Sequence, residues 1–165
     1  MEYNERLVRR FEALTDDELA RIHLSLFGME LDAVGLTRLR LAEHALHTWD
    51  IDVALDPAAR VAPDSVALLI GALSAIATRA GKPQGKIFRL RVRTTEPDRD
   101  LLLQVADEVS TAEWDGAAAD GELRIPSEAF LRLVYGRLDP DHAPAVDMSA
   151  QNITLDDLRR IFPGT

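Results

Sequence analysis

The segment from Arg38 to Ile51, RLRLAEHALHTWDI, holds the residues whose types and spacing are best suited to chemistry. Glu43 and His47 are four positions apart, so a helix of 3.6 residues per turn places them on the same face. That face also carries the apolar residues Leu36, Leu39, Leu46 and Ala54. We therefore expect a carboxylate and an imidazole within a buried apolar stripe, where the charge must be compensated.

Two kinds of compensation fit this pair. Helix bundles commonly build metal sites from inward-facing Glu and His side chains. Alternatively, Glu43 and His47 pair with each other or with a buried arginine, which is a structural role. His23 lies between apolar residues and is either a further ligand or a structural histidine. We expect His44 at the edge of the stripe, His142 exposed in a loop and Trp49 in the core.

The elements that must position these residues are helical in the first half of the chain. Thr15 to Glu18 reads as a capping box, and proline residues near 57, 63 and 83 mark boundaries between segments. We predict helices over residues 2–14, 16–29, 35–54 and 64–81.

After residue 83 the pattern changes to strands. Residues 86–93 alternate apolar and basic residues, which predicts a half-buried strand with Arg89, Arg91 and Arg93 on one face. A solvated sheet face explains these arginines better than an anion site does. Further strands are predicted at 101–105, 112–114 and 122–125, and helices at 127–137 and 154–162. We therefore predict an α+β protein with a helical part over 1–82 and a small α+β domain over 83–165.

Composition excludes several classes of partner and chemistry. The net charge of −9 argues against a nucleic-acid partner and an anionic membrane surface. The absence of cysteine excludes disulfides and thiolate ligands, so any thiol must come from outside the chain. The first residues lack the apolar stretch of a signal peptide, and we expect a cytoplasmic protein.

Two strings of residues resemble a known family. Glu43-x-x-x-His47-x-Trp49-Asp50-Ile51 is similar to the second metal-binding helix of the mycothiol-dependent maleylpyruvate isomerases. The segment from Leu131 to Arg137 resembles their Leu-x-Gly-Arg signature, and residues 152–164 resemble their closing helix and Phe-Pro-Gly. The chain thus resembles the later two thirds of an actinobacterial protein with a DinB-like four-helix bundle and a sterol-carrier-like domain, with the opening helices missing.

The resemblance implies a site as well as a fold. Glu43 and His47 match two ligands of a divalent metal, usually zinc, whose third ligand is a histidine from an early helix. The Trp-x-x-x-Asp-Leu-x-x-His stretch that carries this histidine does not occur in the sequence. A second chain, a second copy of this chain or His23 would have to supply the third ligand. Arg137 would hold the carboxylate of a substrate, or serve the negative end of its helix dipole.

These implications leave two functions open. The first is a metal-dependent, mycothiol-using isomerase or S-transferase that acts on a small electrophile or an unsaturated acid. The second is a non-catalytic binding or interaction module that keeps the fold without a complete metal site. Both predict a homodimer or a partner chain, because a bundle without its opening helices exposes an apolar face.

Overall fold

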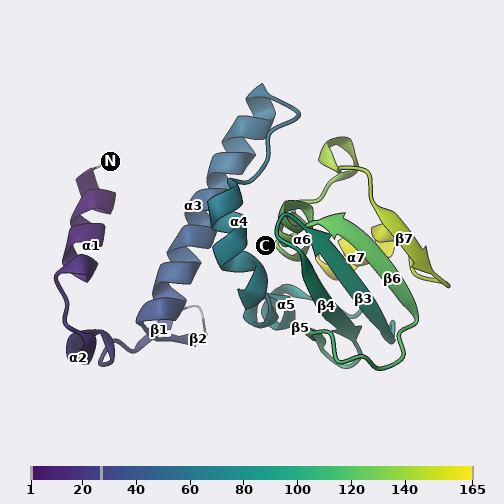
Figure 1. The fold of residues 1–165 in the computed structure, drawn as a ribbon, viewed down its shortest axis with the longest axis horizontal. Helices are drawn as coiled ribbons and strands as arrows, with labels where there is room; N and C mark the ends of the chain where they lie inside the picture. The colour runs from purple at the N-terminus through teal and green to yellow at the C-terminus, as the bar shows by residue number, and fades with distance from the viewer. Residues whose placement is uncertain (1, 27, 165) are drawn as a thin grey trace. The chain divides into compact units, whose positions relative to one another are not determined.

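The computed structural model describes residues 2–26 and 28–164, which divide into two compact units (Figure 1). The first unit ends at Glu43 and the second begins at His44, within one long helix. The change from helices to sheet near residue 83 is present, but the unit that holds the sheet begins well before it. Helices and strands together make an α+β fold.

The first unit combines short helices with a hairpin. Its elements are α1 (Glu2–Glu12), α2 (Asp16–Leu19), β1 (Leu24–Leu26), β2 (Met29–Leu31) and the first part of α3 (Ala33–Leu55). The predicted capping box is present, since the Thr15 hydroxyl accepts a hydrogen bond from the Glu18 amide and the Glu18 carboxylate accepts one from the Thr15 amide.

The predicted helix over 16–29 is wrong beyond Leu19. Strands β1 and β2 pair antiparallel instead, with Leu24 opposite Leu31. Leu-Ser-Leu and Met-Glu-Leu alternate with a period of two, and Gly28 supplies a φ of +76° between them. Phe27 lies outside the described residues.

The second unit places helices against a five-stranded sheet. After the end of α3 come α4 (Pro63–Leu69), η1 (Ile70–Ala72) and α5 (Ser74–Ala80). The strands are β3 (Phe88–Thr95), β4 (Arg99–Val105), β5 (Val109–Glu113), β6 (Gly121–Pro126) and β7 (Asp147–Ala150). The remaining elements are α6 (Ser127–Val134), η2 (Pro140–His142) and α7 (Leu155–Ile161).

The sheet has the order β5-β4-β3-β6-β7, in which only β3 and β6 are parallel. One face is buried and apolar, because Leu90 and Val92 of β3 stand beside Leu103 and Leu101 of β4. Helix α6 packs against β3 and β6, and all of its side chains are buried. Of the strands predicted from sequence, all four are present, while β7 was not predicted.

Two predicted helices differ in detail. The single helix over 64–81 is divided by η1, which contains Gly71, a residue that destabilises a helix interior. Ser127 does not cap α6, because its hydroxyl lies 2.8 Å from Thr94 Oγ1 and 2.7 Å from the carbonyl oxygen of Pro97. It thereby holds the turn between β3 and β4 against the start of α6. Helix α6 also ends at Val134, before Gly136 at a φ of +69°.

Candidate functional site

The buried stripe of helix α3 shares Leu46 with the predicted one but passes through Ala42 and Trp49 instead of Glu43 and His47. Ala42, Leu46 and Trp49 are 1–4% exposed, a spacing of four and three residues that matches one helix face. Glu43 and His47 lie beside this stripe and are exposed. The expectation that they stand in the middle of the buried face is therefore corrected, while the prediction that Trp49 belongs to the core is confirmed.

Asp50 brings together two of the residues singled out in the sequence. His47 Nδ1 lies 3.1 Å from Asp50 Oδ2, one turn further along α3. Arg137 Nε donates to both oxygens of the same carboxylate, at 3.0 and 3.2 Å. Arg137 Nη1 also donates to the Tyr135 carbonyl oxygen at 3.2 Å. The partly exposed carboxylate of Asp50 thus connects the two strings of residues that carry the family resemblance. Asp50 belongs to the first string and Arg137 to the second, 87 positions later.

Sequence reasoning did not assign a role to Asp50. The signal was available, because residues 43, 47 and 50 follow one another along a single face of a helix. What the sequence did not reveal is that the chain returns to this face at Arg137.

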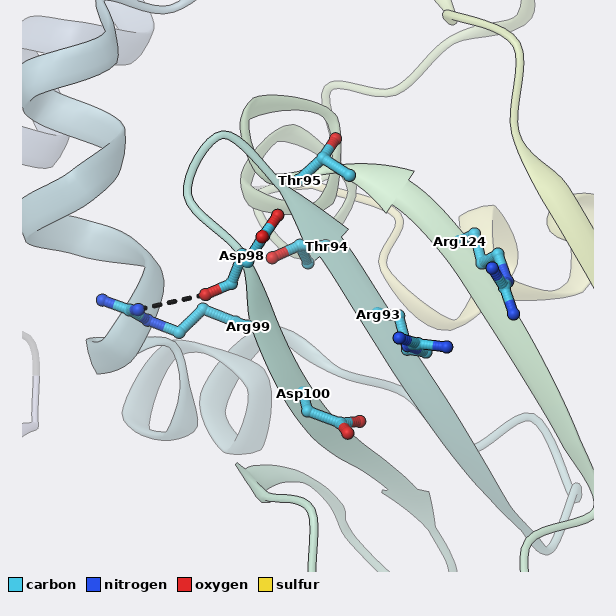
Figure 2. Close-up of a pocket in the computed structure, with 7 residues that line it drawn as sticks. All are labelled: Arg93, Thr94, Thr95, Asp98, Arg99, Asp100 and Arg124. Carbon is cyan, nitrogen blue, oxygen red and sulfur yellow. Dashed lines mark hydrogen bonds between the residues drawn. The ribbon is translucent and has the colours of Figure 1, made fainter.

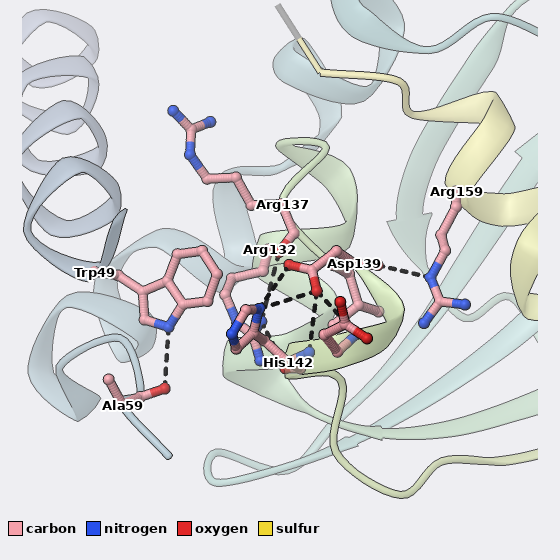
Figure 3. Close-up of polar contacts among 9 residues, drawn as sticks. Trp49, Ala59, Arg132, Arg137, Asp139, His142 and Arg159 are labelled. Carbon is pink, nitrogen blue, oxygen red and sulfur yellow. Dashed lines mark hydrogen bonds and ion pairs between the residues drawn. The ribbon is translucent and has the colours of Figure 1, made fainter. Parts of the chain in front are cut away.

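Beneath this contact lies a buried arginine. Arg132 is 2% exposed, and its Nε and Nη2 donate to the two carboxylate oxygens of Glu128 at 2.8 and 3.1 Å. Its Nη1 donates to the His142 carbonyl oxygen at 3.1 Å. The guanidinium carbon stands 4.5 Å from the centre of the Trp49 ring, a cation–π contact. Arg132 therefore ties Trp49, next to Asp50, to the loop that carries Arg137 (Figure 3).

Trp49 and His142 complete this region. The indole nitrogen of Trp49 donates to the Ala59 carbonyl oxygen at 3.0 Å, which fixes the orientation of the ring. His142 was expected to be exposed, but it is half-buried, with its ring edge-on to Trp49 and Nδ1 2.9 Å from Asp139 Oδ1. Burial acts to raise the pKa of Asp139, but hydrogen bonds from the His142 ring and from backbone amides outweigh it and hold that pKa below its usual value.

The side chains on α3 have the right types for a metal site but not the right number. A carboxylate and an imidazole are suitable zinc ligands, and Glu43 and His47 provide one of each on α3. Catalytic zinc sites generally have three protein ligands. Over residues 2–26 and 28–164, no group of three or more His, Asp or Glu side chains is arranged to hold a metal ion. His23 is exposed between α2 and β1 and forms no such group within that part of the chain.

A separate question is whether any helix could span a membrane. Within the described ranges, none of them is both long and apolar enough to cross a bilayer.

Comparison with known proteins does not assign the chain to a family. Neither a scan against models of protein families nor a search of curated proteins gave a match for the sequence.

Proposed function

We propose that this chain is a metal-dependent, mycothiol-using isomerase or S-transferase of the maleylpyruvate isomerase type, working in the cytoplasm on a small electrophile or an unsaturated acid. The observation that supports this proposal is the Asp50 carboxylate, which contacts both His47 and Arg137. The proposal extends to the fold, with the helical part as a partial DinB-like bundle and the sheet with its helices as a sterol-carrier-like domain.

In this proposal Asp50 orients His47. Metal-binding histidines usually place one ring nitrogen against a carboxylate, which fixes the ring and leaves the other nitrogen to coordinate. The contact between His47 Nδ1 and Asp50 has this form, and in the proposal Nε2 would be the nitrogen that coordinates the metal. Glu43, one turn earlier on α3, is the second ligand. The third comes from a second copy of the chain or from a partner chain, because the described residues do not supply it.

Arg137 is the anchor for a substrate carboxylate. Its Nε is held by Asp50 and its Nη1 by the Tyr135 carbonyl oxygen. Within the described residues Nη2 has no hydrogen-bond partner, and the guanidinium points away from the Arg132 and His142 contacts (Figure 3). A guanidinium fixed through two of its nitrogens can use its remaining donors for a carboxylate. The bound metal would supply the thiolate form of the external thiol.

Metal analysis of the purified chain tests the proposal. We expect zinc to bind above background after zinc is supplied and excess is removed, and we expect both Glu43→Ala and His47→Ala to abolish this binding. His142→Ala is the matched control, since it removes an imidazole outside α3 and leaves zinc content unchanged. Equal zinc content in all four proteins, or none in any, rejects the proposal.

A second function is favoured by two observations. Glu43 and His47 are exposed, and the described residues contain no three-ligand group. Both fit a non-catalytic binding module, in which the contact between Asp50 and Arg137 only joins α3 to the loop after α6. Such a module binds no zinc, and Arg137→Gln then changes stability alone. In the enzyme, the same substitution lowers turnover of an unsaturated acid with a thiol and leaves zinc content unchanged.

A further inference from the structure

The outer face of the sheet carries the row of arginines on β3, and the first two are neutralised. Arg89 Nη2 donates to both oxygens of Asp115, at 2.8 and 2.7 Å. Arg91 donates through Nε and Nη2 to the carboxylate of Asp100. For these two residues the sequence-based explanation of a solvated face is sufficient. Arg93 differs.

Arg93 has neighbours that do not neutralise it. Its partner on β4 is Asp100, which already receives two hydrogen bonds from Arg91, and its partner on β6 is Arg124. Arg124 is in turn bound to Glu122, with Nε 2.7 Å from the carboxylate. Among the described residues Arg93 has no hydrogen bond or ion pair through its side chain. The charge of Arg93 is the smallest influence on the pKa of Asp100, which is lowered mainly by the hydrogen bonds from Arg91.

Two like charges in register on neighbouring strands destabilise a sheet. Figure 2 shows Arg93 and Arg124 extending from β3 and β6 on the same side of the sheet. They border an open pocket with a volume of about 370 Å³, which is lined by Arg93, Thr94, Thr95, Asp98, Arg99, Asp100 and Arg124. The guanidinium of Arg99 is turned away from the other two, toward the Asp98 carbonyl oxygen at 3.1 Å.

We propose that this pocket is a binding site for a small anion with several charged oxygens, such as a phosphate group or a dicarboxylate. Arg93 presents its whole guanidinium and Arg124 its two Nη groups, because Nε of Arg124 is bound to Glu122, and planar donors of this kind suit such oxyanions. The exposed Thr95 can add a neutral hydroxyl donor at the rim. An anion between the two arginines relieves their repulsion.

The site is independent of the proposed metal chemistry. It lies on the outer face of the sheet and uses none of the residues of α3. The chain as a whole carries a charge of −9, so general attraction of anions is absent and binding must be local.

Titration of the full chain with inorganic phosphate tests the inference, followed by the side-chain NMR signals of arginine. We expect saturable binding that shifts Arg93 and Arg124 signals and weakens as sodium chloride is raised. Arg93→Gln should weaken binding by about tenfold, because one charge-assisted contact is lost. Arg79→Gln, an exposed arginine on α5, makes the same change in charge and should leave binding unchanged.

Succinate and acetate identify the ligand chemistry. Succinate should compete with phosphate if dicarboxylates share the site, while acetate, with a single charge, should compete far less. If phosphate does not bind saturably, or if Arg79→Gln weakens binding as much as Arg93→Gln, the inference is overturned. Arg93→Gln should unfold at the temperature of the unmodified chain or above it, because a repulsion is removed. Loss of binding by this variant is then not a loss of fold.

Discussion

Arg132 shows how one buried charge can organise a region that otherwise consists of surface contacts. Its guanidinium meets a carboxylate on α6, a carbonyl oxygen in the loop after α6 and the ring of Trp49 on α3. A buried ion pair gives little net stability, because desolvation offsets the attraction, but its partners are fixed in position. Arg132 therefore fixes the geometry at which Asp50 meets Arg137.

A double substitution separates these effects. Arg132→Met leaves the carboxylate of Glu128 buried without its partner, so the free energy of unfolding should fall by about 3–5 kcal/mol. Adding Glu128→Leu removes the stranded charge and should restore most of that loss. Urea unfolding followed by tryptophan fluorescence measures both variants. If the double variant is no more stable than Arg132→Met, the ion pair is not the source of the cost.

The backbone at position 136, just before Arg137, requires a glycine. Its φ is +69°, and a Cβ atom placed there would lie 2.1 Å from the backbone nitrogen of Gly164. Gly164 also has a positive φ, +84°, but a Cβ atom there would meet nothing closer than 3.3 Å. The backbones of the Gly-Arg and Phe-Pro-Gly strings are therefore in contact.

The two glycines give a matched pair of substitutions. Gly136→Ala must accept both a strained φ and a steric overlap, so we expect it to lower the free energy of unfolding by about 2–4 kcal/mol. Gly164→Ala meets the first cost, about 1–2 kcal/mol, and a tight contact of 3.3 Å with the Gly136 carbonyl oxygen in place of the overlap. Thermal and urea unfolding compare them. Equal losses would show that the close approach of the two backbones contributes nothing.

At the scale of elements, α3 shows what periodicity can and cannot decide. Residues 42, 46 and 49 form one row along the helix, and residues 43, 47 and 50 form a second row beside it. Both rows have helical spacing. The sequence located the helix and the chemical residues on it. It could not show which row is buried, because that choice depends on Trp49 stacking on Arg132, 83 residues later. The role of Asp50 was missed because its contact with Arg137 joins residues 87 positions apart.

The strands illustrate the same limit. Strands β3 and β4 were predictable, because alternation and a Pro-containing turn are local signals. Strand β7 has only a weak pattern, Asp-Met-Ser-Ala. It forms because it pairs with β6, from which it is separated along the chain by α6 and η2. The hairpin at Leu24–Leu31 was hidden by the preceding capping box, which starts a helix of only four residues.

Helix α7 is held to the chain before β3 through Asp157. The carboxylate accepts hydrogen bonds from Arg160 and from the amide and hydroxyl of Thr154, and Lys86 Nζ lies 3.1 Å away. These contacts, that of Arg160 first, lower the pKa of Asp157 well below its ordinary value. A lowered pKa gives stability that is present above the unfolded value, about 4, and lost as the pH falls below it.

Replacement of this carboxylate should therefore change the acid dependence of stability. Asp157→Asn is expected to be less stable than the unmodified chain at neutral pH, and the difference should shrink as the pH falls below about 4. Urea unfolding at a series of pH values measures it. Asp156→Asn, the exposed neighbour that pairs with Arg159, should show a much smaller difference at neutral pH. A constant difference at every pH would mean that hydrogen bonding alone, and not charge, makes Asp157 stabilising.

At the scale of the whole molecule, stability is concentrated in the second unit. In the described part of the chain, every buried side chain lies at Ala42 or later. The residues before α3 form short helices and a hairpin whose side chains are exposed or half-buried. Since apolar burial is the main stabilising term, these residues should contribute little to global stability.

Deletion of residues 1–32 tests this distribution, because it leaves α3 whole. We expect cooperative thermal unfolding with a midpoint within about 3 °C of that of the full chain, since less than about 1 kcal/mol is lost. Deletion of residues 155–165 is the contrasting control: it removes the fully buried Leu158, Ile161 and Phe162, and it should abolish cooperative unfolding. If the N-terminal deletion also abolishes it, residues 1–32 stabilise the fold by something other than burial. The contributions of helix capping and hydrogen bonds in the first unit to the free energy of unfolding would then have to be measured.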